Sequence, residues 1–135
     1  QDFNYTELNT LLKYDSPFCA GWYVKDLSGI AMIADWNEED FKKQGTMNFW
    51  NSSKIQKQQK PFEVDYCGFG FTKVSTEILK KMEYPYFRQR VVEIGKYKEN
   101  VSEDASFCLD VAEQLDVRPK ILPQLRINHL KELYI

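Results

Sequence analysis

Two runs of β-prone residues separated by only five positions constrain this chain more than any other feature of its sequence. The runs cover residues 18–24 and 30–36, contain aromatic and β-branched side chains, and are joined by a connection that ends in Gly29. A connection of this length with a glycine suits a β-hairpin. We therefore expect the two runs to form neighbouring antiparallel strands.

Helical patterns lie on both sides of these runs. Asn4 can cap a short helix with Glu7 at its third helical position, and Ser75 can cap another. The last helix is the best defined, because Ser102 or Asn100 can cap it and its apolar residues recur at helical spacing. Those apolar residues are Phe107, Cys108, Val111, Ala112 and Leu115.

The remaining segments alternate between extended and polar character. Residues 37–60 are rich in Gln, Lys and Asn, and we interpret them as a mobile loop or lid. The order of elements predicts one α/β domain over residues 1–135, or α+β when taken as an isolated piece, with a mixed sheet and flanking helices. The further extended pieces are residues 62–74, which two glycines interrupt, 90–94, 120–122 and 125–130.

Composition excludes several classes of function. The 18 Lys and Arg residues are scattered among 20 Asp and Glu residues, so the net charge of -2 does not suit a nucleic-acid partner. No apolar stretch approaches the roughly 20 residues that span a bilayer. Cys19, Cys67 and Cys108 are widely spaced within apolar runs, which indicates buried free thiols and a cytoplasmic location.

Two acids and the histidine are the candidate catalytic and metal-binding residues. Glu103 and Asp104 fall in the first turn of the last helix, where adjacent side chains point about 100° apart, so one of them can act as a catalytic base. Their alternative role is to stabilise the helix dipole by roughly 0.3–1 kcal/mol. His129 is either a metal ligand or a half-buried strand histidine.

Five pieces of the sequence, taken in order, resemble the carboxyl-terminal half of a GT-A type glycosyltransferase, which uses a nucleotide-sugar donor. No single piece is specific, and the resemblance depends on their common order from residue 11 to residue 131. The pieces are Leu11-Leu12 with Asp15 and Cys19-Ala20-Gly21-Trp22-Tyr23, then Cys67-Gly68-Phe69-Gly70-Phe71, then Tyr84-Pro85-Tyr86-Phe87, then Ser102-Glu103-Asp104 with Phe107-Cys108, and His129-Leu130-Lys131.

The resemblance assigns a role to each matching acid and base. It implies that Asp104 takes the proton from the acceptor hydroxyl, with Glu103 as its neighbour or stand-in. It also implies that His129 completes a divalent-metal site, for Mn²⁺ or Mg²⁺, and that Lys131 offsets phosphate charge. One base without a second nucleophile predicts inversion at the anomeric carbon of the sugar.

The substrate-binding residues implied by the resemblance are Trp22 and the run Gly68-Phe69-Gly70. Glycine lets the main chain approach a ligand closely, so this run would form a floor beneath the sugar. The implied partners are a nucleotide-sugar and a glycan or another hydroxyl acceptor.

The chain departs from the family at its amino end. In the family, a nucleotide-binding half with an Asp-x-Asp metal motif precedes the helix expected at residues 5–13, and here Asp2 is the one residue that could belong to that motif. We therefore expect a partial GT-A fold that is truncated and weakly active or inactive alone, because His129 by itself holds a metal weakly. The uncovered sheet edge predicts a homodimer or a larger assembly.

Two alternatives compete with sugar transfer. A non-catalytic carbohydrate-binding or protein-interaction module would use its aromatic side chains for stacking. A thiol enzyme would pair Cys67 or Cys108 with His129, but neither cysteine has a basic neighbour in the sequence to lower its pKa. The aromatic residues available for stacking are Trp22, Tyr23, Trp36, Trp50 and Tyr66.

Overall fold

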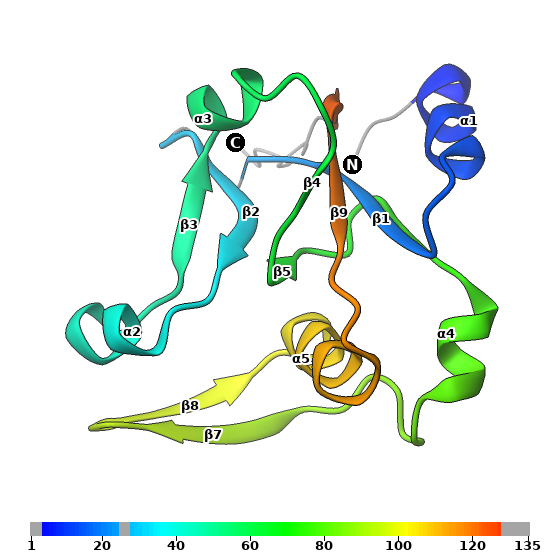
Figure 1. Cartoon of the computed structure of the whole chain (residues 1–135). Helices are drawn as coiled ribbons and strands as arrows, with labels where there is room; N and C mark the ends of the chain where they lie inside the picture. The colour runs from blue at the N-terminus through cyan, green and yellow to red at the C-terminus, as the bar shows by residue number, and fades with distance from the viewer. Residues whose placement is uncertain (1–3, 25–27, 128–135) are drawn as a thin grey trace, which may run out of the picture.

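The computed structural model describes residues 4–24 and 28–127, which form five helices and three small sheets (Figure 1). A mixed sheet with flanking helices was predicted, and this level of the prediction is confirmed. The helices are α1 (Tyr5–Lys13), α2 (Glu38–Gln44), α3 (Ser52–Gln56), α4 (Thr76–Lys81) and α5 (Glu103–Leu115). The strands are β1 (Phe18–Trp22), β2 (Ile30–Asp35), β3 (Asn48–Asn51), β4 (Phe62–Glu63), β5 (Tyr66–Cys67), β6 (Thr72–Val74), β7 (Arg90–Ile94), β8 (Tyr97–Val101) and β9 (Lys120–Arg126).

The largest sheet has four strands in the order β4-β9-β1-β6. β1 runs parallel to β9 and antiparallel to β6, and β4 runs antiparallel to β9. All five residues of β1 are buried, which explains why its sequence is a continuous apolar run rather than an alternating one. This sheet forms the centre of the fold.

The predicted hairpin between β1 and β2 is largely wrong, although both runs form strands. β2 lies between β3 and β5 in a separate three-stranded antiparallel sheet. Within the described residues, the predicted pairing survives as one antiparallel bridge between Val24 and Ala31. The physical reason is that β6 and β9 already occupy both edges of β1, so β2 has no edge of β1 on which to continue.

Residues 37–60, interpreted from the sequence as a loop or lid, contain α2, β3 and α3. Asn37 caps α2 by accepting a hydrogen bond from the backbone of Asp40, and Asn51 caps α3 in the same way from Lys54. The polar residues that resembled a loop therefore include two helix caps. The long extended segment 62–74 is also divided, because β4, β5 and β6 are separate short strands in two sheets.

The predicted helix starts are confirmed. Asn4 and Glu7 form a capping box at α1, and the Ser75 hydroxyl accepts from the backbone N–H of Glu77 at α4. Strand β7 matches the predicted extended piece at residues 90–94, whereas its partner β8 was not predicted. Figure 1 shows this β7–β8 hairpin running from beside α5 toward α2.

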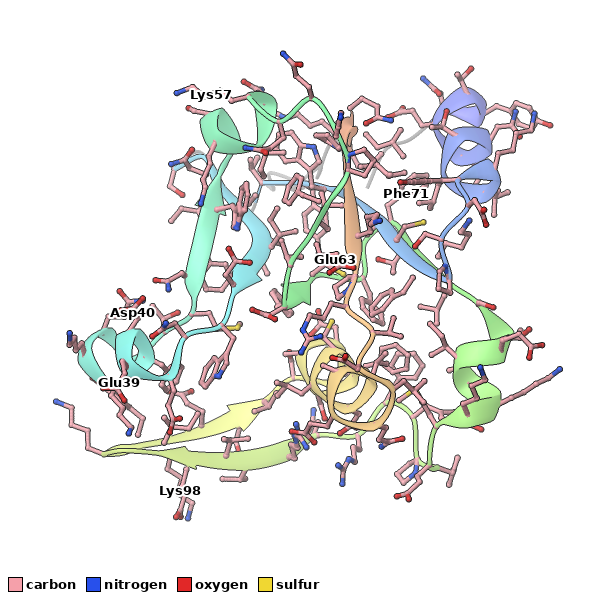
Figure 2. All side chains as sticks on the ribbon, in the orientation of Figure 1. Glu39, Asp40, Lys57, Glu63, Phe71 and Lys98 are labelled. Atoms are coloured by element: carbon pink, nitrogen blue, oxygen red, sulfur yellow. The ribbon has the colours of Figure 1, made fainter. Side chains whose placement is uncertain are left out.

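Two apolar clusters form the core. The larger one joins the central sheet to α5, with Phe18 and Phe107 among its fully buried members. The smaller one lies beneath α1 and contains Leu11, Phe71 and Leu122. Figure 2 shows the Phe71 side chain beside α1. The core therefore holds the start of α5 rigidly against the central sheet.

Candidate functional site

Three hydrogen-bond donors hold the carboxylate of Asp104 in the first turn of α5. The Ser102 hydroxyl donates to Oδ1 at 2.5 Å, and the backbone N–H of Ala105 donates to the same oxygen at 2.8 Å. The Tyr66 hydroxyl, from β5, donates to Oδ2 at 3.3 Å. Ser102 is the N-cap residue as predicted, yet its hydroxyl bonds this carboxylate rather than a backbone N–H. The carboxylate is therefore fixed in one orientation.

Two tyrosine side chains near this carboxylate remain protonated. Burial, followed by the negative charge of Asp104, raises the pKa of Tyr66 far above its ordinary value. Burial and the same charge also raise the pKa of Tyr23, although a hydrogen bond with the Gly70 backbone opposes the shift. Both phenols therefore stay neutral across the physiological range of pH, and that of Tyr66 donates to Asp104.

Asp104 lines a hollow of about 430 Å³, which we call the Asp104 hollow. It brings together four of the predicted site residues. Phe69 and Gly70 come from one segment, and Glu103 and Asp104 from another that lies more than 30 positions later. No residue between positions 71 and 86 contributes to it. The residues that line it are Tyr23, Phe69, Gly70, Phe87, Ser102, Glu103 and Asp104.

Stacked aromatic rings support the floor of the Asp104 hollow. The ring of Phe87 stacks on the buried ring of Phe107, with centroids 4.5 Å apart and planes 13° apart. Phe69 meets both rings edge to face, at 5.8 Å from Phe87 and 5.5 Å from Phe107. Because Phe107 belongs to α5, these contacts couple the floor to the helix that carries Asp104.

Gly68 and Trp22 lie outside the Asp104 hollow. A Cβ atom on Gly68 would lie 2.3 Å from the Tyr23 hydroxyl, so the group that approaches this glycine closely is a tyrosine of the same chain. Trp22 is 1% exposed, and its indole N–H donates to the backbone oxygen of Pro123 at 2.8 Å. In this position the Trp22 ring packs in the core and offers no open face for a sugar.

The other predicted residues are placed as follows. Glu103 lines the rim of the Asp104 hollow and accepts a hydrogen bond from Gln89 at 3.4 Å. His129 and Lys131 lie outside the described residues. Within residues 4–24 and 28–127, no three side chains of His, Cys, Asp or Glu form a group that could hold a metal ion. The described residues therefore provide no ligand set for the predicted Mn²⁺ or Mg²⁺.

A buried ion-pair cluster beside the site was missed from the sequence. Asp110 of α5 is 1% exposed, and Arg88 binds it through two hydrogen bonds of 3.0 and 3.2 Å. Arg90 of β7 lies 3.2 Å from the same carboxylate and 3.4 Å from Glu113. The signal was present, because Asp110 follows Phe107 by three positions and so shares its buried face. This cluster ties the β7–β8 hairpin to α5.

A second hollow, of about 680 Å³, lies between the β7–β8 hairpin, α2 and α5. We call it the hairpin hollow. The tip of the hairpin closes one end of it, because the ring of Tyr97 packs against Phe41 of α2 with centroids 5.6 Å apart. Ser102 lines both hollows, and Tyr66 of the hairpin hollow donates to Asp104 of the other. The two hollows are therefore adjacent at Ser102, and the Tyr66–Asp104 hydrogen bond links their walls.

The cysteines do not support the thiol-enzyme alternative. All three are buried and free, as the sequence predicted. The Cys108 thiol contacts the backbone oxygen of Cys67 at 3.9 Å. A hydrogen bond with Cys108, together with burial, holds the pKa of the Cys67 thiol well above its ordinary value. A thiol in this state is a poor nucleophile at neutral pH.

Comparison of the chain with protein families, curated proteins and solved structures finds no match. In the part of the chain that the structure describes, no helix has the length and apolar character needed to cross a membrane. The interpretation of the site therefore depends on its own geometry.

Proposed function

We propose that this chain is a glycosyltransferase domain that transfers a sugar from a nucleotide-sugar donor to a hydroxyl acceptor. The observation that carries the proposal is the Asp104 hollow, in which a positioned carboxylate faces the segment Phe69-Gly70. The volume of about 430 Å³ lies within the range of small-molecule sites. Sugar-binding sites commonly combine a carboxylate with aromatic walls, and Tyr23, Phe69 and Phe87 form such walls here.

Asp104 is the proposed general base. Within the described residues, its Oδ2 accepts one hydrogen bond and its Oδ1 accepts two, so Oδ2 has more capacity left for a proton. The acceptor hydroxyl gives its proton to Asp104 while its oxygen bonds to the anomeric carbon of the donor. The bond from that carbon to the diphosphate breaks, and its electron pair leaves with the phosphate oxygen. A single displacement of this kind inverts the anomeric centre.

A divalent cation at His129 is part of the proposal, and the ion would offset the charge of the departing diphosphate. The described residues contribute no ligand group to this ion, so the step assigned to Asp104 does not depend on it. Ser102 and Tyr66 orient the carboxylate of Asp104 by donating hydrogen bonds to it, and Asp104 receives the proton of the acceptor hydroxyl.

The test is sugar transfer by the 135-residue chain. Nucleotide-sugars would be supplied with and without Mn²⁺ or Mg²⁺, with simple glycosides as acceptors, and release of nucleoside diphosphate would be measured with the glycoside product. We expect Asp104→Asn to lower turnover by about 10²–10⁴-fold, the usual contribution of a general base. Asp116→Asn is the matched control, because Asp116 ends the same helix and its side chain is 88% exposed.

Two outcomes would contradict the proposal. If Asp104→Asn keeps the turnover of the unmodified chain, Asp104 is not the general base. The second outcome is that the chain binds glycans yet shows neither sugar transfer nor a change in tryptophan fluorescence when nucleotides are added. That result would identify a carbohydrate-binding module instead.

A further inference from the structure

The hairpin hollow is separate from the Asp104 hollow, and the two are adjacent. Its volume of about 680 Å³ exceeds that of the Asp104 hollow, and Ser102 belongs to both. Tyr66, which lines the hairpin hollow, donates a hydrogen bond to Asp104 across the junction. A molecule with a hydroxyl at Asp104 and its other end beneath the β7–β8 hairpin would pass Ser102, the residue that both hollows share.

The walls of the hairpin hollow are largely apolar. β7 alternates between half-buried and exposed residues, which turns Val92 and Ile94 inward. Opposite them lie Phe41, which is 7% exposed, and Trp36, which is 36% exposed. An aromatic side chain that stays partly open beside a hollow of this size provides a stacking surface for a flat apolar group.

The charges around the hairpin hollow exclude an anionic occupant. The lining residues of the described chain include the acids Asp65, Glu93, Glu99 and Glu113. They include a single base, Arg90, which is already paired with Asp110 and Glu113. A phosphate or carboxylate placed here would meet net negative charge. The charges therefore disfavour an anion, and the apolar walls favour an apolar occupant.

We propose that the hairpin hollow binds the neutral aromatic or aliphatic aglycone of the acceptor, so that the substrate class is an amphipathic glycoside rather than a free sugar. This inference rests on the proposed function, because it places the acceptor hydroxyl at Asp104. The hydroxyl-bearing sugar occupies the Asp104 hollow, and the apolar group lies between Trp36 and the inner face of β7.

The experiment compares phenyl and methyl glycosides of glucose, galactose and mannose on the 135-residue chain by titration calorimetry. We expect at least one phenyl glycoside to bind about tenfold or more tightly than its methyl counterpart, because binding removes the apolar phenyl ring from contact with water. Binding should also change the fluorescence of Trp36, and Trp36→Phe should abolish that change.

Two variants locate the binding to the hairpin hollow. Val92→Glu places a charge on the inner face of β7 and should reduce the ratio of phenyl to methyl affinity to about one. Lys98→Glu is the matched control, since Lys98 projects from β8 on the side away from α2 (Figure 2) and should keep the ratio. Circular dichroism checks the fold of both, and Val92→Phe, which fills the hollow without a charge, replaces Val92→Glu if that variant unfolds.

The outcomes separate this inference from the proposed function. Equal affinity for phenyl and methyl glycosides, or no binding of any phenyl glycoside, overturns the aglycone site and leaves the role of Asp104 unaffected. An unchanged ratio in Val92→Glu overturns it as well. Asp104→Asn should keep the ratio while losing transfer, so failure of transfer in the unmodified chain counts against the proposed function alone.

Discussion

The Asp104 hollow and the hairpin hollow are neighbours, yet the structure supports them in opposite ways. The floor of the first rests on Phe107, which is 0% exposed and belongs to the main core. The roof of the second is a two-stranded hairpin, attached by the ion pairs of Asp110 near one end and by the ring of Tyr97 near its tip. We infer that the first is as stable as the whole fold, whereas the second opens at a lower free-energy cost.

The largest expected effect is on the floor of the Asp104 hollow. Phe107→Ala should lower the free energy of unfolding by about 3–5 kcal/mol, because it leaves a cavity beneath Phe69 and Phe87. Val92→Ala, in the half-buried wall of the hairpin, should cost about 1 kcal/mol or less. Urea denaturation measures both, and equal costs would break the comparison.

The next effect concerns the attachment of the hairpin to α5. Asp110→Ala should cost about 2–3 kcal/mol, because it leaves Arg90, whose side chain is 20% exposed, without its buried partner. Glu113→Ala, on the same helix with a 62% exposed side chain, should cost less than about 1 kcal/mol. In hydrogen exchange, Asp110→Ala should expose the amides of β7 and β8 more than those of β1 and β9. Uniform acceleration would show that the hairpin does not open separately.

A smaller effect is expected at the hairpin tip. Gly45 has a φ of 77°, and a Cβ atom there would lie 2.9 Å from the Tyr97 ring. Gly45→Ala should therefore cost about 1–2 kcal/mol and loosen the tip. Gly29→Ala is a matched control, because the φ of Gly29 is 81° but its nearest neighbour in the described part of the chain, the Ser52 hydroxyl, lies 3.5 Å away. If the backbone amides of the hairpin undergo hydrogen exchange at the same rate in both variants, Tyr97 does not hold the tip.

The smallest effect is at the junction of the two hollows. Tyr66→Phe should cost about 1 kcal/mol at neutral pH, since it removes the hydrogen bond to Asp104. The fold raises the pKa of Tyr66 above its ordinary value of 10.0. The resulting stabilisation is complete below about pH 10 and is lost as pH rises, because the unfolded chain releases the proton first.

Urea midpoints measured between about pH 9 and 11 check this prediction. The decline of stability with pH should be less steep in Tyr66→Phe than in the unmodified chain. Tyr84→Phe, at a side chain that is 82% exposed, should follow the unmodified chain. A decline that is identical in all three proteins would remove Tyr66 as its source.

The two hollows also differ in how far the sequence predicted them. The helical stripe of α5 and the glycine-interrupted segment contain local signals, so the acids and Phe69-Gly70 were identified before the structure placed them together. The hairpin hollow depends on β8 and α2, whose segments are polar. β8 was not predicted, and the α2 segment was interpreted as a loop. In the α2 segment, Asn37 caps the helix by accepting a hydrogen bond from the backbone N–H of Asp40, and a polar residue acts as a cap only when such a donor lies in the right position.

Long-range pairings were the least predictable part of the fold. The run that forms β1 predicted a strand correctly, but its neighbours β6 and β9 come from distant positions and displace the expected hairpin partner. Helical spacing places Asp110 on the buried face of α5, but its partners Arg88 and Arg90 come from outside that helix, so the ion pairs were not predicted. Local patterns indicate which residues are buried. Which strands pair and which charged side chains bind each other depends on competition between distant segments of the chain.

The position of β9 has a consequence for biosynthesis. This strand, the last one described, lies between β4 and β1 rather than at an edge. The ribosome releases β1 and β4 before β9, so both keep an unpaired edge until β9 emerges. Protease cleavage of ribosome-bound chains that stop before residue 120 should therefore occur within β1, and addition of the final strand should protect it. The central sheet is therefore completed only after residues 120–126 have left the ribosome.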